Sequence, residues 1–75
     1  MTDLPQLTGK KLVNLLKKSG FAVVRSKGSH FVLKSEDGRM TVVPVHSGET
    51  IGPGLLSKIL QDCELTREDL KKLLK

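Results

Sequence analysis

The alternation of apolar and polar positions changes its period along this chain, and each change predicts a different element. In residues 8–20, "TGKKLVNLLKKSG", apolar residues recur at helical spacing and lysines lie around them. The apolar stripe consists of Leu12, Val13, Leu15 and Leu16. Thr8 is a favoured N-cap residue, and Gly20 suits the left-handed position that ends many helices. The pattern therefore predicts a helix between Thr8 and Gly20.

After Gly20 the pattern becomes typical of extended chain. Three short segments are rich in β-branched residues and are separated by turns: residues 21–26, 30–35 and 40–45. The first turn is residues 27–29, and the second contains the Asp37-Gly38 pair, which favours positive φ. These segments predict a three-stranded meander. Because Pro44 has no N–H to give to a ladder, we expect the third strand to be an edge strand or to end there.

Helical spacing returns after the turn-forming stretch "HSGETIGPG". Pro53 can occupy the first position of a helix, because its missing N–H would have no partner there. Apolar residues then follow at helical spacing: Leu55, Leu56, Ile59, Leu60 and Cys63. The pattern predicts a helix over residues 53–62.

A last helix is predicted from Thr66 onward. Thr66 and Asp69 have the spacing of a capping box, and leucines stand at the two hydrophobic-staple positions, Leu65 and Leu70. The apolar stripe of this helix is Leu70, Leu73 and Leu74.

The order α-β-β-β-α with an extra C-terminal helix predicts an α+β fold. Its helices would lie on one face of a twisted, three-stranded antiparallel sheet. Strand parity directs Phe31 and Leu33 toward the helices and His30, Val32 and Lys34 away from them. No repeat, low-complexity tract or linker interrupts the pattern, so we expect one domain over residues 1–75.

Composition narrows the class of protein. Hydrophobic residues make up 37% of the chain and charged residues 28%, which is typical of a folded, soluble protein. No apolar run approaches the ~20 residues of a membrane-spanning helix, and the N-terminus lacks the order of a signal peptide. We therefore expect a cytoplasmic protein with no membrane partner. The single cysteine, Cys63, cannot form an intrachain disulfide, and we expect it to be a buried small side chain and not a nucleophile.

Charge indicates the class of partner. The chain has 13 Lys and Arg against 8 Asp and Glu, a net charge of +5, which favours a polyanion such as nucleic acid. The alternative is that the charge serves only solubility. Seven of the bases and one acid, Asp3, lie in the first 35 residues, so the N-terminal half is the basic surface. With no Trp or Tyr available for base stacking, we expect recognition through phosphates and shape.

Linked motifs resemble a known family over nearly the whole chain. "GSH" at 28–30 opens the second strand, "VPVH" at 43–46 closes the third, and "IGPGLLSKIL" leads into the last core helix. With the α-β-β-β-α order, these pieces resemble the HicA toxins. The resemblance implies a double-stranded-RNA-binding-like fold and a ribosome-independent mRNA interferase of a type II toxin-antitoxin system. It also implies mRNA as the target and a HicB-like antitoxin as the protein partner.

The resemblance also implies a catalytic residue, His30, which is the histidine of the Gly-Ser-His motif. RNA supplies its own nucleophile, the 2′-hydroxyl, so a histidine that accepts or donates a proton near neutral pH can promote cleavage. This scheme needs no metal and no cofactor. Many family members have a second polar or basic residue after the histidine, where this chain has Phe31. The expected RNA-binding residues are Lys10, Arg25, Lys27, Gly28, Ser29 and Lys34.

Each of these assignments has a plainer alternative. A lone surface histidine is more often incidental than catalytic, and His46 either takes part in proton transfer or only ends a strand. The lysines of the first helix can be a solvated face. For the whole chain, one alternative is a non-catalytic double-stranded-RNA-binding module, although the last core helix offers only Lys58 where such modules carry a basic cluster. Another is a small protein-interaction domain whose charge is incidental.

Overall fold

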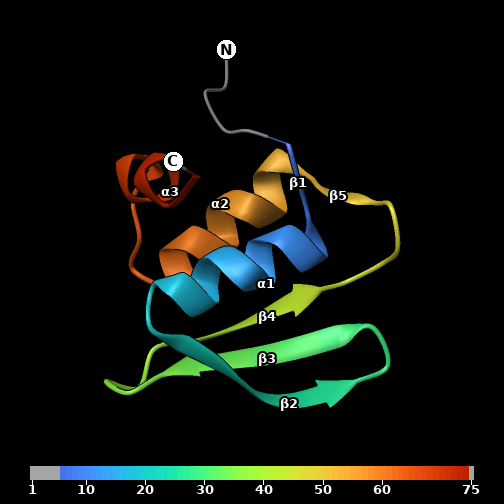
Figure 1. The fold of residues 1–75 in the computed structure, drawn as a ribbon, viewed down its shortest axis with the longest axis horizontal. Coiled ribbons are helices and arrows are strands. Elements are labelled where there is room, and N and C mark those ends of the chain that lie inside the picture. The colour runs from blue at the N-terminus through green and yellow to red at the C-terminus, as the bar shows by residue number, and fades with distance from the viewer. Residues whose placement is uncertain (1–5, 75) are drawn as a thin grey trace.

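A computed structural model describes residues 6–74 of the chain. Figure 1 shows the helices gathered above a small sheet, with β4 nearest to them and β2 farthest away. The elements follow in the order β1 (Leu7–Thr8), α1 (Gly9–Lys18), β2 (Phe21–Lys27), β3 (His30–Ser35), β4 (Met40–Pro44), β5 (Thr50–Ile51), α2 (Pro53–Asp62) and α3 (Arg67–Leu74).

The predicted α-β-β-β-α order is confirmed by α1, the three strands β2 to β4, and α2, with α3 as the extra C-terminal helix. The three strands form one antiparallel sheet in the order β2-β3-β4. β4 is an edge strand and ends at Pro44, as the missing N–H of proline predicts. It is therefore one residue shorter than the predicted segment, whereas β2 extends one residue further, to Lys27.

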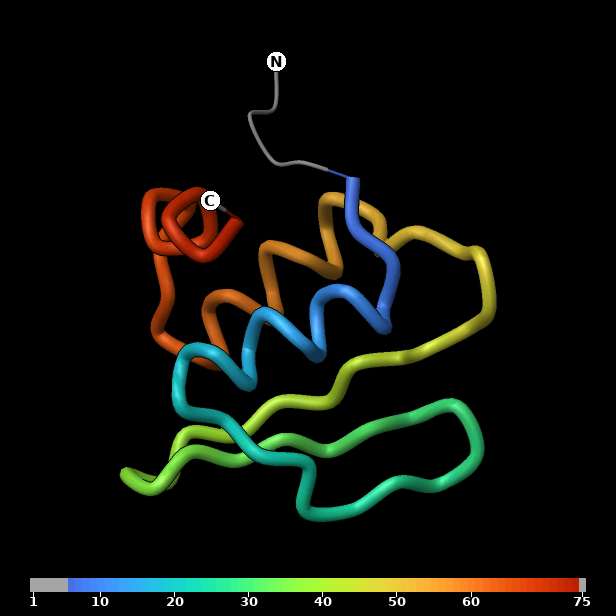
Figure 2. Tube along the Cα trace, in the orientation of Figure 1, coloured from blue at the N-terminus to red at the C-terminus, as the bar shows by residue number. Residues whose placement is uncertain are grey.

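A second, two-stranded sheet was not predicted. β1 pairs with β5, so that Leu7 lies opposite Ile51 and Thr8 opposite Thr50. Figure 2 shows the chain before α1 passing beside the chain before α2. Both Leu7 and Ile51 are buried. Strands of two residues show no periodicity, and the surrounding turn formers indicated only a loop.

The predicted helix ends are confirmed. The Thr8 hydroxyl accepts a hydrogen bond from the Lys11 amide at 3.2 Å, and Gly20 follows α1 with a φ of 96°. At α3 the capping box is reciprocal: the Thr66 amide donates to Asp69 at 2.9 Å, and the Asp69 amide donates to the Thr66 hydroxyl at 3.1 Å. These bonds to Thr66 lower the pKa of Asp69.

The core lies between the helices and the inner face of the sheet. Its most deeply buried side chains are Leu12, Leu16, Leu33, Val43, Leu56, Ile59, Cys63 and Leu70. The predicted parity of β3 is confirmed, because Leu33 is buried and Phe31 packs against the core, while His30 and Lys34 are exposed.

Two residues of the predicted apolar stripes depart from the core. Leu74 is exposed at the last turn of α3. Leu55 is 38% exposed in the first turn of α2, where it faces a groove beside β4 instead of the core.

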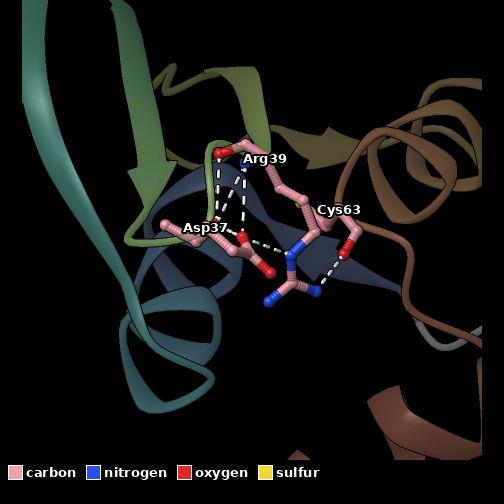
Figure 3. A network of polar contacts seen from close by, with 4 residues as sticks. Asp37, Arg39 and Cys63 are labelled. Atoms are coloured by element: carbon pink, nitrogen blue, oxygen red, sulfur yellow. Dashed lines mark hydrogen bonds and ion pairs between the residues drawn. The ribbon is translucent and has the colours of Figure 1, made fainter.

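Arg39 joins the β3–β4 turn to the end of α2 (Figure 3). Its Nε donates to the Asp37 carboxylate at 3.0 Å, and its Nη1 donates to the Cys63 carbonyl at 2.6 Å. The guanidinium also lies over the Phe21 ring, 5.1 Å from its centroid. Hydrogen bonds from the Ser35 hydroxyl and from Arg39 lower the pKa of Asp37 to about 2. The sequence pattern indicated a turn here but not this connection between two elements.

Candidate functional site

His30 lies on the face of the sheet that points away from the helices, together with basic residues from two strands. The register places Lys27 of β2 and Pro44 of β4 directly opposite it. Residues opposite each other in a sheet share a face, so Lys27 and His30 are neighbours. The next rows along this face are Arg25, Val32 and Val42, and then Ala22, Lys34 and Met40. The structure thus brings four predicted site residues together on one open face: Arg25, Lys27, His30 and Lys34.

The turn before His30 is held against the end of β4. Gly28 has a φ of 58°, the left-handed conformation that glycine adopts most readily. The Ser29 carbonyl accepts a hydrogen bond from the Val45 amide at 2.6 Å. The Ser29 hydroxyl lies 3.5 Å from Nε2 of His46. The structure therefore places His46 beside the turn that carries His30, a proximity the sequence did not indicate.

A groove of about 460 Å³ begins at His30 and lies between β4 and α2. Its walls include Met40, Val42 and Pro44 from β4, and Leu55, Lys58 and Asp62 from α2. The strand residues belong to the outer face of the sheet, whereas α2 covers the inner face. Since such residues can meet only around the free edge of β4, the groove follows that edge.

The polar side of this groove is ordered. Lys58 Nζ lies 3.5 Å from the Asp62 carboxylate, one turn further along α2. The same carboxylate accepts a hydrogen bond from the Thr41 hydroxyl at 3.1 Å. Sequence reasoning missed the groove because it depends on where α2 crosses β4. Leu55 lines this groove and is the one exposed residue in an apolar stripe that is otherwise buried.

Lys10 lies apart from the other predicted RNA-binding residues. It is the second residue of α1 and lines a different hollow, with Asn14, Lys17, Phe31 and Val45. Because Phe31 and His30 point to opposite faces of β3, Lys10 is not on the His30 face. The preceding residue, Gly9, packs directly on the backbone of Pro44, which places the start of α1 beside the row that contains His30. Lys10 therefore lies close to Pro44, on the helix side of the sheet, whereas His30 lies on the opposite side.

Cys63 is buried, and burial raises the pKa of its thiol to about 11, so the thiol is protonated at neutral pH. This agrees with its predicted role as a small core residue. Within residues 6–74 no three His, Cys, Asp or Glu side chains cluster in a way that could hold a metal ion. None of the helices in this part of the chain has the length and apolarity needed to cross a membrane.

Comparison with known families agrees with the order of elements and with the motifs around His30. Comparison with curated proteins finds no match. A family model described as HicA toxin of bacterial toxin-antitoxin matches residues 9–65, which is more than half of the chain and runs from the start of α1 past the end of α2. The chain therefore belongs to the HicA family of toxins from bacterial toxin-antitoxin systems.

Proposed function

We propose that this toxin is a ribosome-independent endoribonuclease, an mRNA interferase, in which His30 acts as a general acid or base. The observation that supports this most directly is the exposed position of His30 at one end of a groove, with Lys27 directly across the strand pair. An imidazole in this position can reach a phosphodiester without disturbing the core. The lysine beside it can stabilise negative charge on the phosphate.

In the proposed reaction, the 2′-hydroxyl of RNA attacks the adjacent phosphorus while a base removes its proton and an acid protonates the departing 5′-oxygen. His30 carries one of these proton transfers. His46, at 3.5 Å from the Ser29 hydroxyl, is the second exposed histidine near the turn and is the candidate for the other transfer. Lys27, with the amides of Gly28 and Ser29, would surround the phosphate, and Lys34, two rows further along the same face, would contact a neighbouring phosphate. The reaction leaves a 2′,3′-cyclic phosphate or a 3′-phosphate.

RNA binding would rest on phosphate contacts. Arg25 and Lys27 lie on the His30 face, and Lys10 lies near Pro44 on the helix side of the sheet. The sugar-phosphate backbone of an RNA could therefore pass beside Pro44 and contact residues on both sides. The expected partners are mRNA in the cytoplasm and an acidic, HicB-like antitoxin that covers the His30 face. No cofactor is part of this proposal.

The experiment compares His30→Ala with His46→Ala, since both side chains are exposed and neither is needed by the core. His30→Ala should keep its circular dichroism spectrum and its RNA affinity while cleavage falls by about 10²–10⁴. Cells that express the His30→Ala variant should no longer show growth arrest. His46→Ala should lose activity only if it carries the second proton transfer. Cleavage by the unchanged chain should persist in EDTA, and its products should end in a cyclic or 3′-phosphate.

Two outcomes would contradict the proposal. Full cleavage by a folded His30→Ala variant would remove His30 from the chemistry and leave His46 as the candidate proton-transfer residue. If the unchanged chain bound duplex RNA without cleaving any RNA, the alternative of a non-catalytic RNA-binding module would be correct.

A further inference from the structure

The free edge of β4 has backbone groups that its own sheet does not use. The Val45 amide bonds to the Ser29 carbonyl, and the Ser35 amide bonds to the Arg39 carbonyl. In an antiparallel pair, residues that exchange hydrogen bonds alternate with residues that do not. The register therefore makes Thr41 and Val43 the bonded residues of β4, and it turns the N–H and C=O groups of Met40 and Val42 toward the free edge.

The side chains beside this edge are apolar. Met40 is 55% exposed, Val42 is 44% exposed, and Leu55 of α2 is 38% exposed across the groove. Exposed apolar residues that line one groove indicate a surface that another chain covers. A strand that adds to a sheet edge needs both features found here: unused main-chain donors and acceptors, and contacts for alternate side chains.

Charge favours one class of occupant. The sheet face next to the edge carries Arg25, Lys27 and Lys34, and the chain as a whole has a net charge of +5. A second copy of the chain would bring like charges together, whereas an acidic segment would be attracted. Pro44 has no N–H and its backbone already packs on Gly9, so main-chain pairing should stop before Pro44.

We propose that an extended, acidic and apolar segment of the antitoxin binds along β4 as a fourth strand of the sheet. This inference rests on the toxin-antitoxin partnership given above and adds the mode of binding. Since His30 lines the same groove, a strand placed there would also obstruct access to His30. Inhibition would then follow from main-chain pairing at β4, beside the site, and not from a contact with the imidazole alone.

Amide hydrogen exchange tests the main-chain pairing directly. The ¹⁵N-labelled chain is compared alone and in complex with its co-expressed, full-length antitoxin. On strand addition, the amides of Met40 and Val42 should become at least about tenfold slower to exchange, because they gain partners. The amide of Val43 is the internal control, since it is already bonded to β3 in the free chain. Unchanged exchange at both Met40 and Val42 in a saturated complex would overturn the proposal.

Substitution tests the same edge by affinity. Val42→Lys places a charge on the edge, a device by which natural sheets prevent strand addition. Val24→Lys is the matched control, because Val24 is also an exposed valine, at 57% against 44% for Val42, and lies on the strand farthest from β4. Val42→Lys should weaken binding of the antitoxin by about tenfold or more, and Val24→Lys by less than about threefold.

Equal affinities of the two variants for the antitoxin would contradict docking at β4. Failure of the unchanged chain to bind any antitoxin would contradict both the partnership and the strand. The nuclease proposal is tested separately by RNA cleavage without antitoxin, so its failure would leave these binding results in place.

Discussion

Replacing Gly9 by alanine should destabilise this fold, although the same change elsewhere in a helix is usually favourable. Gly9 is the first residue of α1 and is buried against the end of β4. A Cβ at this position would overlap the Pro44 carbonyl oxygen and would lie 2.9 Å from the Cα of Val45. Both neighbours are backbone atoms, so no rotamer change can make room.

The size of the effect follows from this geometry. To restore van der Waals contact, the start of α1 must move from β4 by on the order of 1 Å. Overpacking of this kind typically costs about 1–3 kcal/mol, against a gain of at most about 1 kcal/mol from the helix propensity of alanine. For a domain of this size, each kcal/mol changes the melting temperature by about 4–8 °C. Gly9→Ala should therefore lower the melting temperature by several degrees or more.

Gly54→Ala is the matched control. Gly54 is the second residue of α2, and a Cβ added there meets no atom within 4 Å outside its chain neighbours and the adjoining helix backbone. The melting temperature of the Gly54→Ala variant should be the same as that of the unchanged chain or a few degrees higher. Thermal unfolding followed by circular dichroism measures both variants. A Gly9→Ala variant as stable as Gly54→Ala would refute the reasoning, because it would mean that α1 does not need to touch β4.

Three further predictions concern charge and chemistry. Lys10→Glu with Lys27→Glu should weaken RNA binding across sequences and reduce the salt dependence of the affinity, measured by filter binding at two or more salt concentrations; an unchanged slope would place the phosphates elsewhere. The pKa of Asp37 is lowered to about 2, so its stabilising effect is present above about pH 4 and is lost as pH falls toward 2. Asp37→Asn should therefore lower the melting temperature at neutral pH, with a difference from the unchanged chain that shrinks below about pH 4; a constant difference would argue against this linkage. The Cys63 thiol, with a pKa raised to about 11, should react slowly with a disulfide reagent at pH 8 in the folded chain and rapidly in denaturant.

Most of the fold follows from local pattern. The apolar stripes of α1 and α2, the capping box at Thr66 and the Asp37-Gly38 turn each determine an element from neighbours in sequence, and all of them are confirmed. The β1–β5 sheet could not be predicted, since two-residue strands have no period and pair across more than forty positions. The same limit applies to Gly9, whose close contact with Pro44 is visible only after α1 and β4 are placed side by side.

The candidate site divides in the same way. Strand parity alone predicted that His30 and Lys34 lie on one side of β3, and the pairing of β2 adds Arg25 and Lys27 to that face. The groove along β4 depends on how α2 crosses the sheet, so the sequence does not indicate which residues line it together. Leu55 shows the difficulty, because its spacing assigns it to the core stripe and only the position of α2 exposes it.

The alternation along β3 lets one strand serve two purposes in a small chain. Residues on one face contribute to the core, and residues on the other face contribute to the candidate site. Leu33 is fully buried and Phe31 packs against the core, while His30 and Lys34, which flank them in the strand, are exposed. Helices cover only the inner face, so a polar group on the outer face stays in contact with water when the chain folds. A substitution at His30 should therefore cost little stability and, under the proposed mechanism, act on the chemistry, whereas one at Leu33 acts on stability first. This separation is what allows the His30→Ala experiment to be interpreted as a test of mechanism.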